Sequence, residues 1–314
     1  MNKKMIKDFV EGESITTPLL VSNVLNGVTT NGSPYMSISF SDKTGLIEGK
    51  LWDVKEEQAN IITVGNVIAV NFDVIKYKNN LQVKVHSVNS IKSDQYDIND
   101  FVASSEIPQQ VMREAMASTL KMIENKVLKE IVSAVVDRFE HDFFLYPAAS
   151  RIHHDFIGGL AEHVLGMIKL GISIAEQYPL IDRDLLISGI IVHDMGKLFE
   201  LSGTIATEYT TEGRLIGHIS IMQAKLSMIA IELGYDDSEE VMLLRHMVLS
   251  HHGAYEYGSP VLPMIVEAEI LSMIDNIDAR MNTLSKALKD IKEGEFTPRL
   301  FALENRSFYK PVRQ

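Results

Sequence analysis

The stretch LLISGIIVHDMGK, residues 185–197, carries the strongest signal in this sequence. Its apolar residues predict a buried helix that ends at His193-Asp194, and Gly196 is expected to take a left-handed conformation that lets the chain leave. Adjacent helical residues point about 100° apart, so this imidazole and this carboxylate reach a common centre only near the helix end. A divalent metal ion fits that place, but two ligands are too few to hold it. Further ligands are therefore expected from other helices.

Two other apolar helical stretches supply candidate ligands. His163 lies in GGLAEHVLGMIKL, residues 158–170, and Asp275 lies in EAEILSMIDNIDAR, residues 267–280. Each has a simpler interpretation, as a hydrogen-bonded core histidine or a solvated carboxylate. A buried aspartate without a partner would cost several kcal/mol, however, so pairing or metal coordination is expected. The order of His163, His193-Asp194 and Asp275 resembles the H…HD…D signature of HD-domain phosphohydrolases, and we infer a metal site.

Further histidines extend this resemblance. His218 and the pair His251-His252 fall between the HD dipeptide and Asp275, where two-metal HD enzymes place the ligands of a second ion. The resemblance implies that Asp194 bridges two ions, with one set of ligands in His163, His193 and Asp275, and the other in His218 and His251. Of the adjacent pair, we expect His251 to be the ligand, because one of the two can instead cap the helix dipole. His246 lies off the helical face of His251 and is expected to be structural or to lie at the surface.

The first part of the chain has a different period. Apolar residues alternate with polar ones between residues 18 and 91, as in half-buried strands, with turn-forming residues between the runs. The pattern predicts strands at 18–26, 35–40, 46–52, 66–77 and 81–91, and a short helix within 54–63, as in an oligonucleotide-binding (OB) barrel. Phe40 and Phe72 are assigned to its core. Other aromatic and basic residues are assigned to a surface of the barrel that binds a nucleic acid strand. They are Tyr35, Trp52, Tyr77, Lys76 and Lys78.

Beyond Pro108 the periodicity is helical. It predicts helices at 108–141, 159–177, 183–194, 216–233, 238–252 and 263–291, with Gly234 and Gly253 as further left-handed caps. We therefore expect a multidomain protein in which an all-β OB-fold barrel is followed by an all-α HD domain. The expected divisions are an OB-fold nucleic-acid-binding domain at 1–95, a linker and leading helices at 96–150, the HD domain at 151–300 and a C-terminal tail at 301–314.

Composition restricts the chemistry. The 314 residues include no cysteine, which excludes disulfides, thiolate metal sites and cysteine nucleophiles. The net charge is −12, and residues 1–100 hold 10 basic and 12 acidic residues, so the acidity lies in the remaining 20 basic and 30 acidic residues. A surface that attracts nucleic acid everywhere is thereby excluded. Without a run of 18 apolar residues or a signal-peptide pattern, we expect a cytoplasmic protein with no membrane partner.

The most specific resemblance covers almost the whole chain. The OB-like segment, HHDFIGGLAEHV (153–164), HDMGK (193–197), TTEGRLIGHI (210–219) and LSHHGAYEYGSP (249–260) together are similar to the YhaM family of 3'-5' exoribonucleases. This resemblance implies hydrolysis of single-stranded RNA, and of DNA in some members, from the 3' end to nucleoside 5'-monophosphates. It also implies dependence on manganese. From the ligand types we expect two divalent ions, Mn²⁺ first, with Fe²⁺, Mg²⁺ or Co²⁺ as alternatives. A homo-oligomer is left open.

Other residues are assigned to catalysis or substrate contact. Lys197, with Asp194, is expected to act in catalysis by meeting a phosphate oxygen or protonating the leaving 3' oxygen; its simpler interpretation is a helix C-terminal charge. His154, Arg214 and His252 are expected to contact the substrate. Two alternatives remain, a small-nucleotide HD phosphohydrolase and a single-stranded DNA-binding accessory factor with an inactive HD domain. The barrel argues against the first, and the full ligand set argues against the second.

Overall fold

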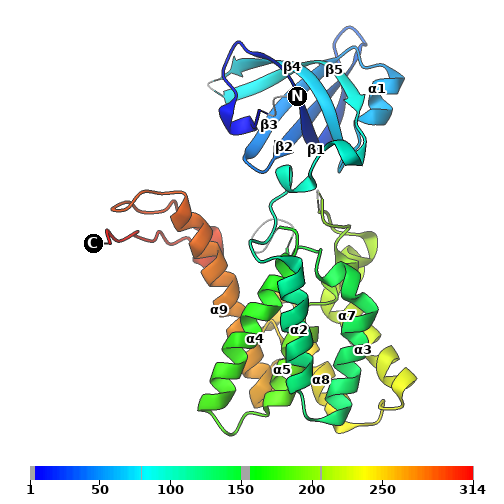
Figure 1. Cartoon of the computed structure of the whole chain (residues 1–314), viewed down its shortest axis with the longest axis vertical. Helices are drawn as coiled ribbons and strands as arrows, with labels where there is room; N and C mark the ends of the chain where they lie inside the picture. Colours follow the sequence, from blue (N-terminus) through cyan, green and yellow to red (C-terminus); the bar gives the residue numbers. More distant parts are fainter. Residues whose placement is uncertain (1–3, 79, 150–155, 206, 314) are drawn as a thin grey trace. The chain divides into compact units, whose positions relative to one another are not determined.

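The computed structural model describes residues 4–78, 80–149, 156–205 and 207–313. The chain forms two compact units, residues 1–104 and 105–314 (Figure 1). The finer division expected from the sequence, with boundaries after residues 95, 150 and 300, stays a prediction. Within the described residues, every helix is too short or too polar to span a membrane.

The first unit is a closed five-stranded barrel. Its elements are β1 (Ser14–Val28), β2 (Pro34–Asp42), β3 (Gly45–Trp52), the short helix α1 (Glu56–Ile61), β4 (Val67–Tyr77) and β5 (Asn80–Ser90). The strand order is β1-β2-β3-β5-β4, with β4 pairing back to β1. Only the β3–β5 pair is parallel among the described strands. This topology, with a helix between β3 and β4, is the OB fold, and it confirms the five predicted strands and the short helix.

The barrel core follows the alternation of the strands. Phe40 and Phe72 are fully buried, as predicted, and Phe9 packs its ring 5.3 Å from that of Phe72. Gly49 makes room for this core, because a Cβ atom there would lie 2.8 Å from both the Phe40 ring and a Val83 methyl group. Register shifts in β1 and in the β4–β5 pair accompany the curvature that closes the barrel.

The second unit is helical and is built around one apolar helix. Its helices are α2 (Gln109–Met122), α3 (Lys126–Phe143), α4 (Gly159–Gln177), α5 (Arg183–Val192), α6 (Lys197–Glu200), α7 (Thr211–Leu233), α8 (Glu239–Ser250) and α9 (Val266–Lys289). Helix α5 packs against α3, α4, α8 and α9, and all of its residues from Leu185 to Val192 are buried. A helix that is apolar on every side belongs in the centre of such a bundle. Its C-terminal end is therefore also buried.

The single helix predicted at 108–141 is wrong, because the structure divides it into α2 and α3. Asn125 caps α3 by accepting a hydrogen bond from the Leu128 amide, and Asp184 accepts hydrogen bonds from the Glu124 and Asn125 amides. These side chains satisfy the amide groups that a continuous helix would have bonded internally. A carboxylate some sixty residues away in the sequence thus contributes to the break.

The glycine predictions were partly right. Gly234 and Gly253 have the predicted positive φ values of 74° and 77°. Gly196 does not, because its φ is −61°. It is needed for close approach instead, since a Cβ atom there would lie 2.1 Å from the carbonyl oxygen of His218. Gly217 also has a positive φ value, 77°, and it breaks α7 immediately before His218.

The chain after α9 forms a C-terminal hairpin, residues 294–310. Isolated bridges join Phe296 to Tyr309 and Leu300 to Arg306, and a short 3₁₀ turn, η5 (Phe301–Leu303), lies at the tip. Leu303 is buried, so the tip is packed against the helical unit. The segment expected as a tail from residue 301 onward contributes η5 and one side of both bridges to this hairpin.

Candidate metal centre

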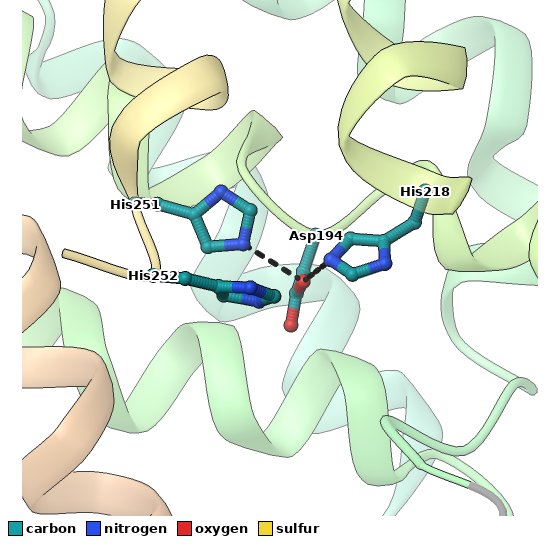
Figure 2. A group of neighbouring side chains, drawn as sticks. All are labelled: Asp194, His218, His251 and His252. Carbon is teal, nitrogen blue, oxygen red and sulfur yellow. Dashed lines mark ion pairs between the residues drawn. The ribbon is translucent and has the colours of Figure 1, made fainter. Parts of the chain in front are cut away.

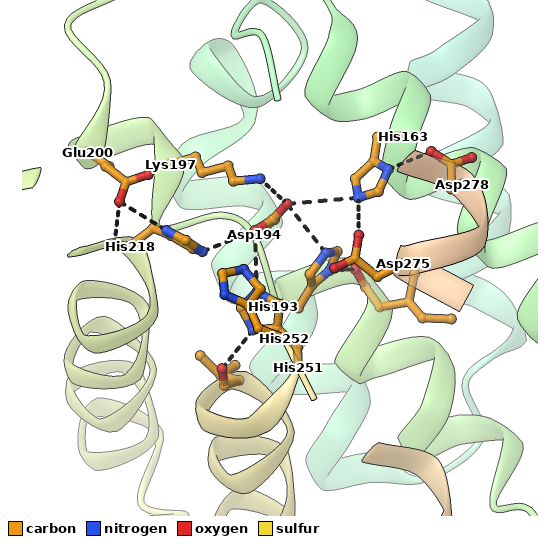
Figure 3. A network of polar contacts seen from close by, with 12 residues as sticks. His163, His193, Asp194, Lys197, Glu200, His218, His251, His252, Asp275 and Asp278 are labelled. Carbon is orange, nitrogen blue, oxygen red and sulfur yellow. Dashed lines mark hydrogen bonds and ion pairs between the residues drawn. The ribbon is translucent and has the colours of Figure 1, made fainter. Parts of the chain in front are cut away.

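Histidines and aspartates from five parts of the helical unit meet at the end of α5. His193 and Asp194 follow α5 directly and are buried. His163 comes from α4, His218 from α7 just after its break, and Asp275 from α9 (Figure 3). His251 and His252 follow the last residue of α8. The structure thus brings together all six residues predicted as metal ligands, with His252 beside them.

The two carboxylate oxygens of Asp194 face different groups of imidazoles. Its Oδ1 atom lies 3.5 Å from Nε2 of His218 and 3.5 Å from Nε2 of His251 (Figure 2). Its Oδ2 atom lies 3.4 Å from Nε2 of His193 and 3.8 Å from Nε2 of His163. Asp275 completes the second group, with Oδ1 3.3 Å from Nε2 of His163. Asp194 therefore separates two clusters that could each hold a metal ion.

These separations suit metal ligands better than hydrogen bonds. Nitrogen–oxygen hydrogen bonds are normally about 2.7–3.2 Å long. Among the described residues, the Nε2 atoms of His193, His218 and His251 and Oδ1 of Asp194 are buried without a hydrogen-bond partner. Two ligand atoms that each lie about 2.1 Å from one ion at 90–110° are roughly 3.0–3.4 Å apart. The donor set therefore fits divalent cations, and the His/Asp cluster suggests that the protein binds them.

Contacts behind the imidazoles direct their Nε2 atoms inward. The Nδ1 atoms of His193 and His251 each lie 2.8 Å from a backbone carbonyl oxygen, that of Ile190 and that of Val248 respectively. The Nδ1 atom of His252 lies 2.6 Å from the Tyr257 carbonyl oxygen. When Nδ1 carries the hydrogen and donates it to a carbonyl, Nε2 keeps its lone pair. Each of these rings then presents an acceptor to the centre.

Two carboxylates that sequence reasoning missed orient the other imidazoles. Asp278 Oδ2 lies 2.7 Å from Nδ1 of His163, and Glu200 Oε1 lies 3.0 Å from Nδ1 of His218 (Figure 3). Asp278 is one helical turn beyond Asp275, so its spacing on α9 was an available signal. Glu200 gave no such signal, because it reaches His218 only through the packing of α6 against α7.

Electrostatics keep the carboxylates ionised and two of the imidazoles neutral. Burial opposes ionisation of Asp194, but the Lys197 ammonium and the His193 imidazole outweigh it and hold the pKa of this carboxyl well below its usual range. Burial lowers the pKa of His251 and of His252, which favours their neutral, metal-binding form. His163 differs: burial opposes its protonation, but the neighbouring carboxylates of Asp275 and Asp278 outweigh this and raise its pKa to about 9.

Of the other residues predicted to act in catalysis or to contact the substrate, some lie at the His/Asp cluster and others do not. Lys197 is in the site, with Nζ 2.5 Å from Oδ2 of Asp194. Burial opposes its charge, but the adjacent carboxylate outweighs this and raises the pKa of Lys197. Arg214 is exposed on α7 and does not line the pocket described below. His154 lies outside the described residues.

The aromatic residues predicted for the barrel surface form two groups. Tyr35 and Trp52 are cross-strand neighbours on β2 and β3, with ring centroids 5.0 Å apart. The Lys50 ammonium lies 5.7 Å and 5.6 Å from these two centroids. Lys76 and Tyr77 are the last residues of β4, and Lys78 follows them. The Tyr77 ring is exposed, and Lys78 Nζ lies 5.5 Å from its centroid.

A pocket of about 640 Å³ opens onto the His/Asp cluster. The cluster contributes to its lining through His218, His251, His252 and Asp275, and Lys197 lies beside them. The other lining residues include Tyr209, Tyr257, Arg280 and Glu304. Pockets of about 300–1,000 Å³ accommodate whole small molecules. The space is therefore larger than a single phosphate group needs.

A family model and a solved structure are each similar to part of this chain. The model of the HD domain family matches residues 160–280, which contain every member of the cluster. Among solved structures, the second OB-fold domain of replication protein A from Methanococcus maripaludis matches with a TM-score of 0.25 and 21% identity, covering 29% of this chain and 96% of that one.

Curated relatives match along nearly the entire chain. The 3'-5' exoribonuclease YhaM of Bacillus subtilis (strain 168) is 44% identical over 302 residues, covering 96% of this chain and 96% of the relative. The protein of the same name from Geobacillus sp. (strain WCH70) is 42% identical over 310 residues, covering 98% of this chain and 95% of the relative. Identity at this level over both whole lengths shows that the chain belongs to the YhaM family of 3'-5' exoribonucleases.

Proposed function

We propose that this chain hydrolyses single-stranded RNA, and also single-stranded DNA, from the 3' end to nucleoside 5'-monophosphates, using two divalent ions. The observation that carries the proposal is the position of Asp194, whose two oxygens each face a separate group of imidazoles. A carboxylate placed in this way can serve two ions at once. The curated relatives are named as 3'-5' exoribonucleases.

The proposed ligands fall into two sets that share Asp194. His163, His193 and Asp275 would complete one set, and His218 and His251 would complete the other, with His252 at its edge. When bound, such ions supply Lewis acidity toward a phosphate group and lower the pKa of water. Imidazole and carboxylate ligands without sulfur suit Mn²⁺ and Fe²⁺, and we propose Mn²⁺.

Lys197 and His252 are the proposed contacts to the substrate beside the ligands. The raised pKa of Lys197 keeps its ammonium group charged at neutral pH, and its side chain lines the pocket. It can therefore donate a hydrogen bond to a phosphate oxygen, or a proton to the leaving 3' oxygen. His252 also lines the pocket, and its lowered pKa keeps the imidazole neutral.

The barrel is proposed to hold the strand away from the cut. Tyr35 and Trp52 offer adjoining rings, and Lys50 lies over both. Bases of a single strand stack on such rings without sequence preference, and lysine attracts the backbone. A duplex should therefore be a poor substrate, because its bases are not free to stack.

The test is a product analysis. Purified protein is incubated with 5'-labelled single-stranded RNA or DNA, in Mn²⁺ or in EDTA, and products are separated by chromatography. We expect nucleoside 5'-monophosphates in Mn²⁺ only, slower degradation of a strand with a 3'-terminal phosphate, and stalling at a blunt duplex. Release of nucleoside 3'-monophosphates, or of internal fragments at early times, would contradict the proposal.

A variant tests the bridging carboxylate. Asp194→Ala should remove both catalysis and most of the bound metal, because each set of ligands loses an oxygen. Elemental analysis and the nuclease assay measure the two effects. Asp236→Asn, an exposed carboxylate in the loop after α7, is the matched control and should change neither. Undiminished metal content with full turnover in Asp194→Ala would refute the assignment.

A further inference from the structure

The pocket continues beyond the His/Asp cluster along one face of α9. Asp275, Asn276, Ala279, Arg280 and Thr283 all line it, at the spacing of neighbouring turns of a helix. A helix rises about 1.5 Å per residue, so Arg280 is roughly 7.5 Å farther along the axis than Asp275. This is close to the length of one nucleotide step in an unstacked strand. The helix therefore leads from the proposed metal centre to a guanidinium group.

The C-terminal hairpin forms another wall of this pocket. Ala302, Leu303 and Glu304, at its tip, line the same pocket. The base of the hairpin is attached to the end of α9, because Lys310 Nζ donates hydrogen bonds to the carbonyl oxygens of Leu288 and Ile291, at 2.7 Å each. The tip is anchored by the buried side chain of Leu303. The wall is thus held at both ends.

The backbone of the hairpin tip is strained. Glu304 and Asn305 are consecutive non-glycine residues with φ values of 53° and 56°. Left-handed conformations are unfavourable for glutamate, whereas asparagine tolerates them better, and such non-glycine residues concentrate at functional sites. Here the strained turn places the Glu304 carboxylate against Arg280, with Nη1–Oε1 and Nη2–Oε2 distances of 2.7 Å and 3.1 Å. The turn thus allows Glu304 to accept two hydrogen bonds from Arg280, and this pair of contacts fixes the plane of the guanidinium.

The charges at this end of the pocket still favour an anion. Glu304 also accepts a hydrogen bond from Arg306 at 2.6 Å, so one carboxylate lies between two guanidinium groups and the three side chains carry a net charge of +1. The contact with Glu304 uses two of the five N–H donors of Arg280. Within the described part of the chain the other donors have no hydrogen-bond partner, and the Arg280 side chain is 34% exposed, so they can reach an incoming ligand.

We propose that Arg280 binds the phosphate one nucleotide upstream of the phosphate being cleaved, and that Glu304 is a positioning residue that holds the guanidinium for it. This inference rests on the proposed nuclease function. Arginine is suited to the task because its planar, permanently charged group forms short charge-assisted hydrogen bonds with phosphate oxygens. The assignment gives the C-terminal hairpin a role in substrate binding.

Substrates of two lengths separate this contact from the reaction itself. A dinucleotide with free 5' and 3' hydroxyls contains only the phosphate that is cleaved, whereas a trinucleotide also contains the upstream one. In full-length Mn²⁺-loaded protein, Arg280→Ala should lower kcat/KM for the trinucleotide by roughly 30-fold, mainly through KM, since a charge-assisted hydrogen bond is lost. The dinucleotide should be cleaved as fast as by wild-type protein.

Two milder variants should have smaller effects. Arg280→Lys should restore part of the kcat/KM for the trinucleotide, because lysine keeps the positive charge. Glu304→Gln should lower this kcat/KM by roughly 5-fold only, because an amide still accepts one hydrogen bond.

The control is Arg138→Ala. Arg138 forms an exposed two-pronged pair with Glu232 in the same unit, and neither residue lines the pocket. Arg138→Ala should leave kcat/KM unchanged for both the dinucleotide and the trinucleotide. Equal losses on dinucleotide and trinucleotide in Arg280→Ala and Arg280→Lys, or no loss on the trinucleotide, would overturn the inference. Wild-type protein that degrades no single strand in Mn²⁺, the longer 5'-labelled strands of the product analysis included, would instead refute the proposed function, and the inference with it.

Discussion

The Nδ1 atom of His163 lies 2.7 Å from Oδ2 of Asp278. On the same helix, one turn earlier, Asp275 places Oδ1 3.3 Å from the other ring nitrogen of His163. A single helix thus contacts both nitrogens of one imidazole, which fixes both the plane of the ring and the direction of Nε2. Carboxylates behind metal-binding histidines commonly orient the ring and raise its basicity.

Removing this carboxylate should weaken metal binding without removing a ligand. Asp278→Ala is expected to lower the metal affinity of the His163 set by about 10- to 100-fold. Asp278→Asn should lower the metal affinity less, because its amide oxygen still accepts a hydrogen bond from Nδ1 of His163. Calorimetric titration with Mn²⁺ measures the effect, and Asp290→Asn, exposed at the end of α9, is the control. Wild-type affinity in Asp278→Ala would show that the contact has no part in orienting His163.

Metal binding should release a proton from His163. Its pKa is raised from 6.5 to about 9 in the metal-free protein, so between these values the folded protein holds a proton that a metal ion must displace. The stabilisation of the metal-free fold by this proton is fully present below pH 6.5 and is lost as the pH rises through 9. The apparent metal affinity should therefore rise with pH across this window.

Calorimetry at pH 8 in two buffers of different ionisation enthalpy measures the proton count. About one proton should be released per metal ion bound at the His163 set in wild-type protein. Asp278→Ala should release fewer, because His163 then loses one of the carboxylates that keep it protonated. An unchanged count in Asp278→Ala would contradict this account.

The close approach of Gly196 to His218 should make a single methyl group damaging. In Gly196→Ala the new Cβ atom would meet the His218 carbonyl oxygen at 2.1 Å, so the backbone of α6 or α7 must move. Overpacking of this kind costs about 1–3 kcal/mol in the free energy of unfolding, and the shift should also weaken metal binding at the His218 set. Thermal unfolding and Mn²⁺ titration measure the two effects. Gly45→Ala, whose Cβ would have no neighbour nearer than 3.5 Å, should be nearly neutral.

The paired rings on the barrel should matter for long substrates only. Trp52→Ala is expected to raise KM for a single-stranded decanucleotide by about 5- to 100-fold, because stacking contributes ~1–3 kcal/mol per base. Hydrolysis of a dinucleotide should be unchanged. Tyr178→Ala removes an exposed aromatic residue from the other unit and is the matched control. A KM for the decanucleotide equal to that of wild-type protein would remove the proposed role of Trp52.

Local patterns in the sequence were sufficient for most of the elements and for the members of the cluster. Alternation of apolar residues predicted all five strands, because a half-buried strand repeats every two residues whatever it packs against. The residues at the end of α5 were predicted to be buried for a similar reason, since a helix that is apolar on every side must lie inside the unit. His163 and Asp275 were found by their place in apolar helices, although the pattern did not show which atoms would meet.

Only the tertiary structure decided how those residues are oriented. The separate directions of the two Asp194 oxygens, the contact of Glu200 with His218 and that of Glu304 with Arg280 all depend on side chains from different elements. The break between α2 and α3 is stabilised in the same way, by Asp184 from another helix. A sequence pattern reports which face of an element is apolar, whereas the distance between two polar atoms depends on how whole elements pack. Gly196 illustrates the difference: its position suggested a left-handed cap, but its small size is required by a chain segment more than twenty residues away.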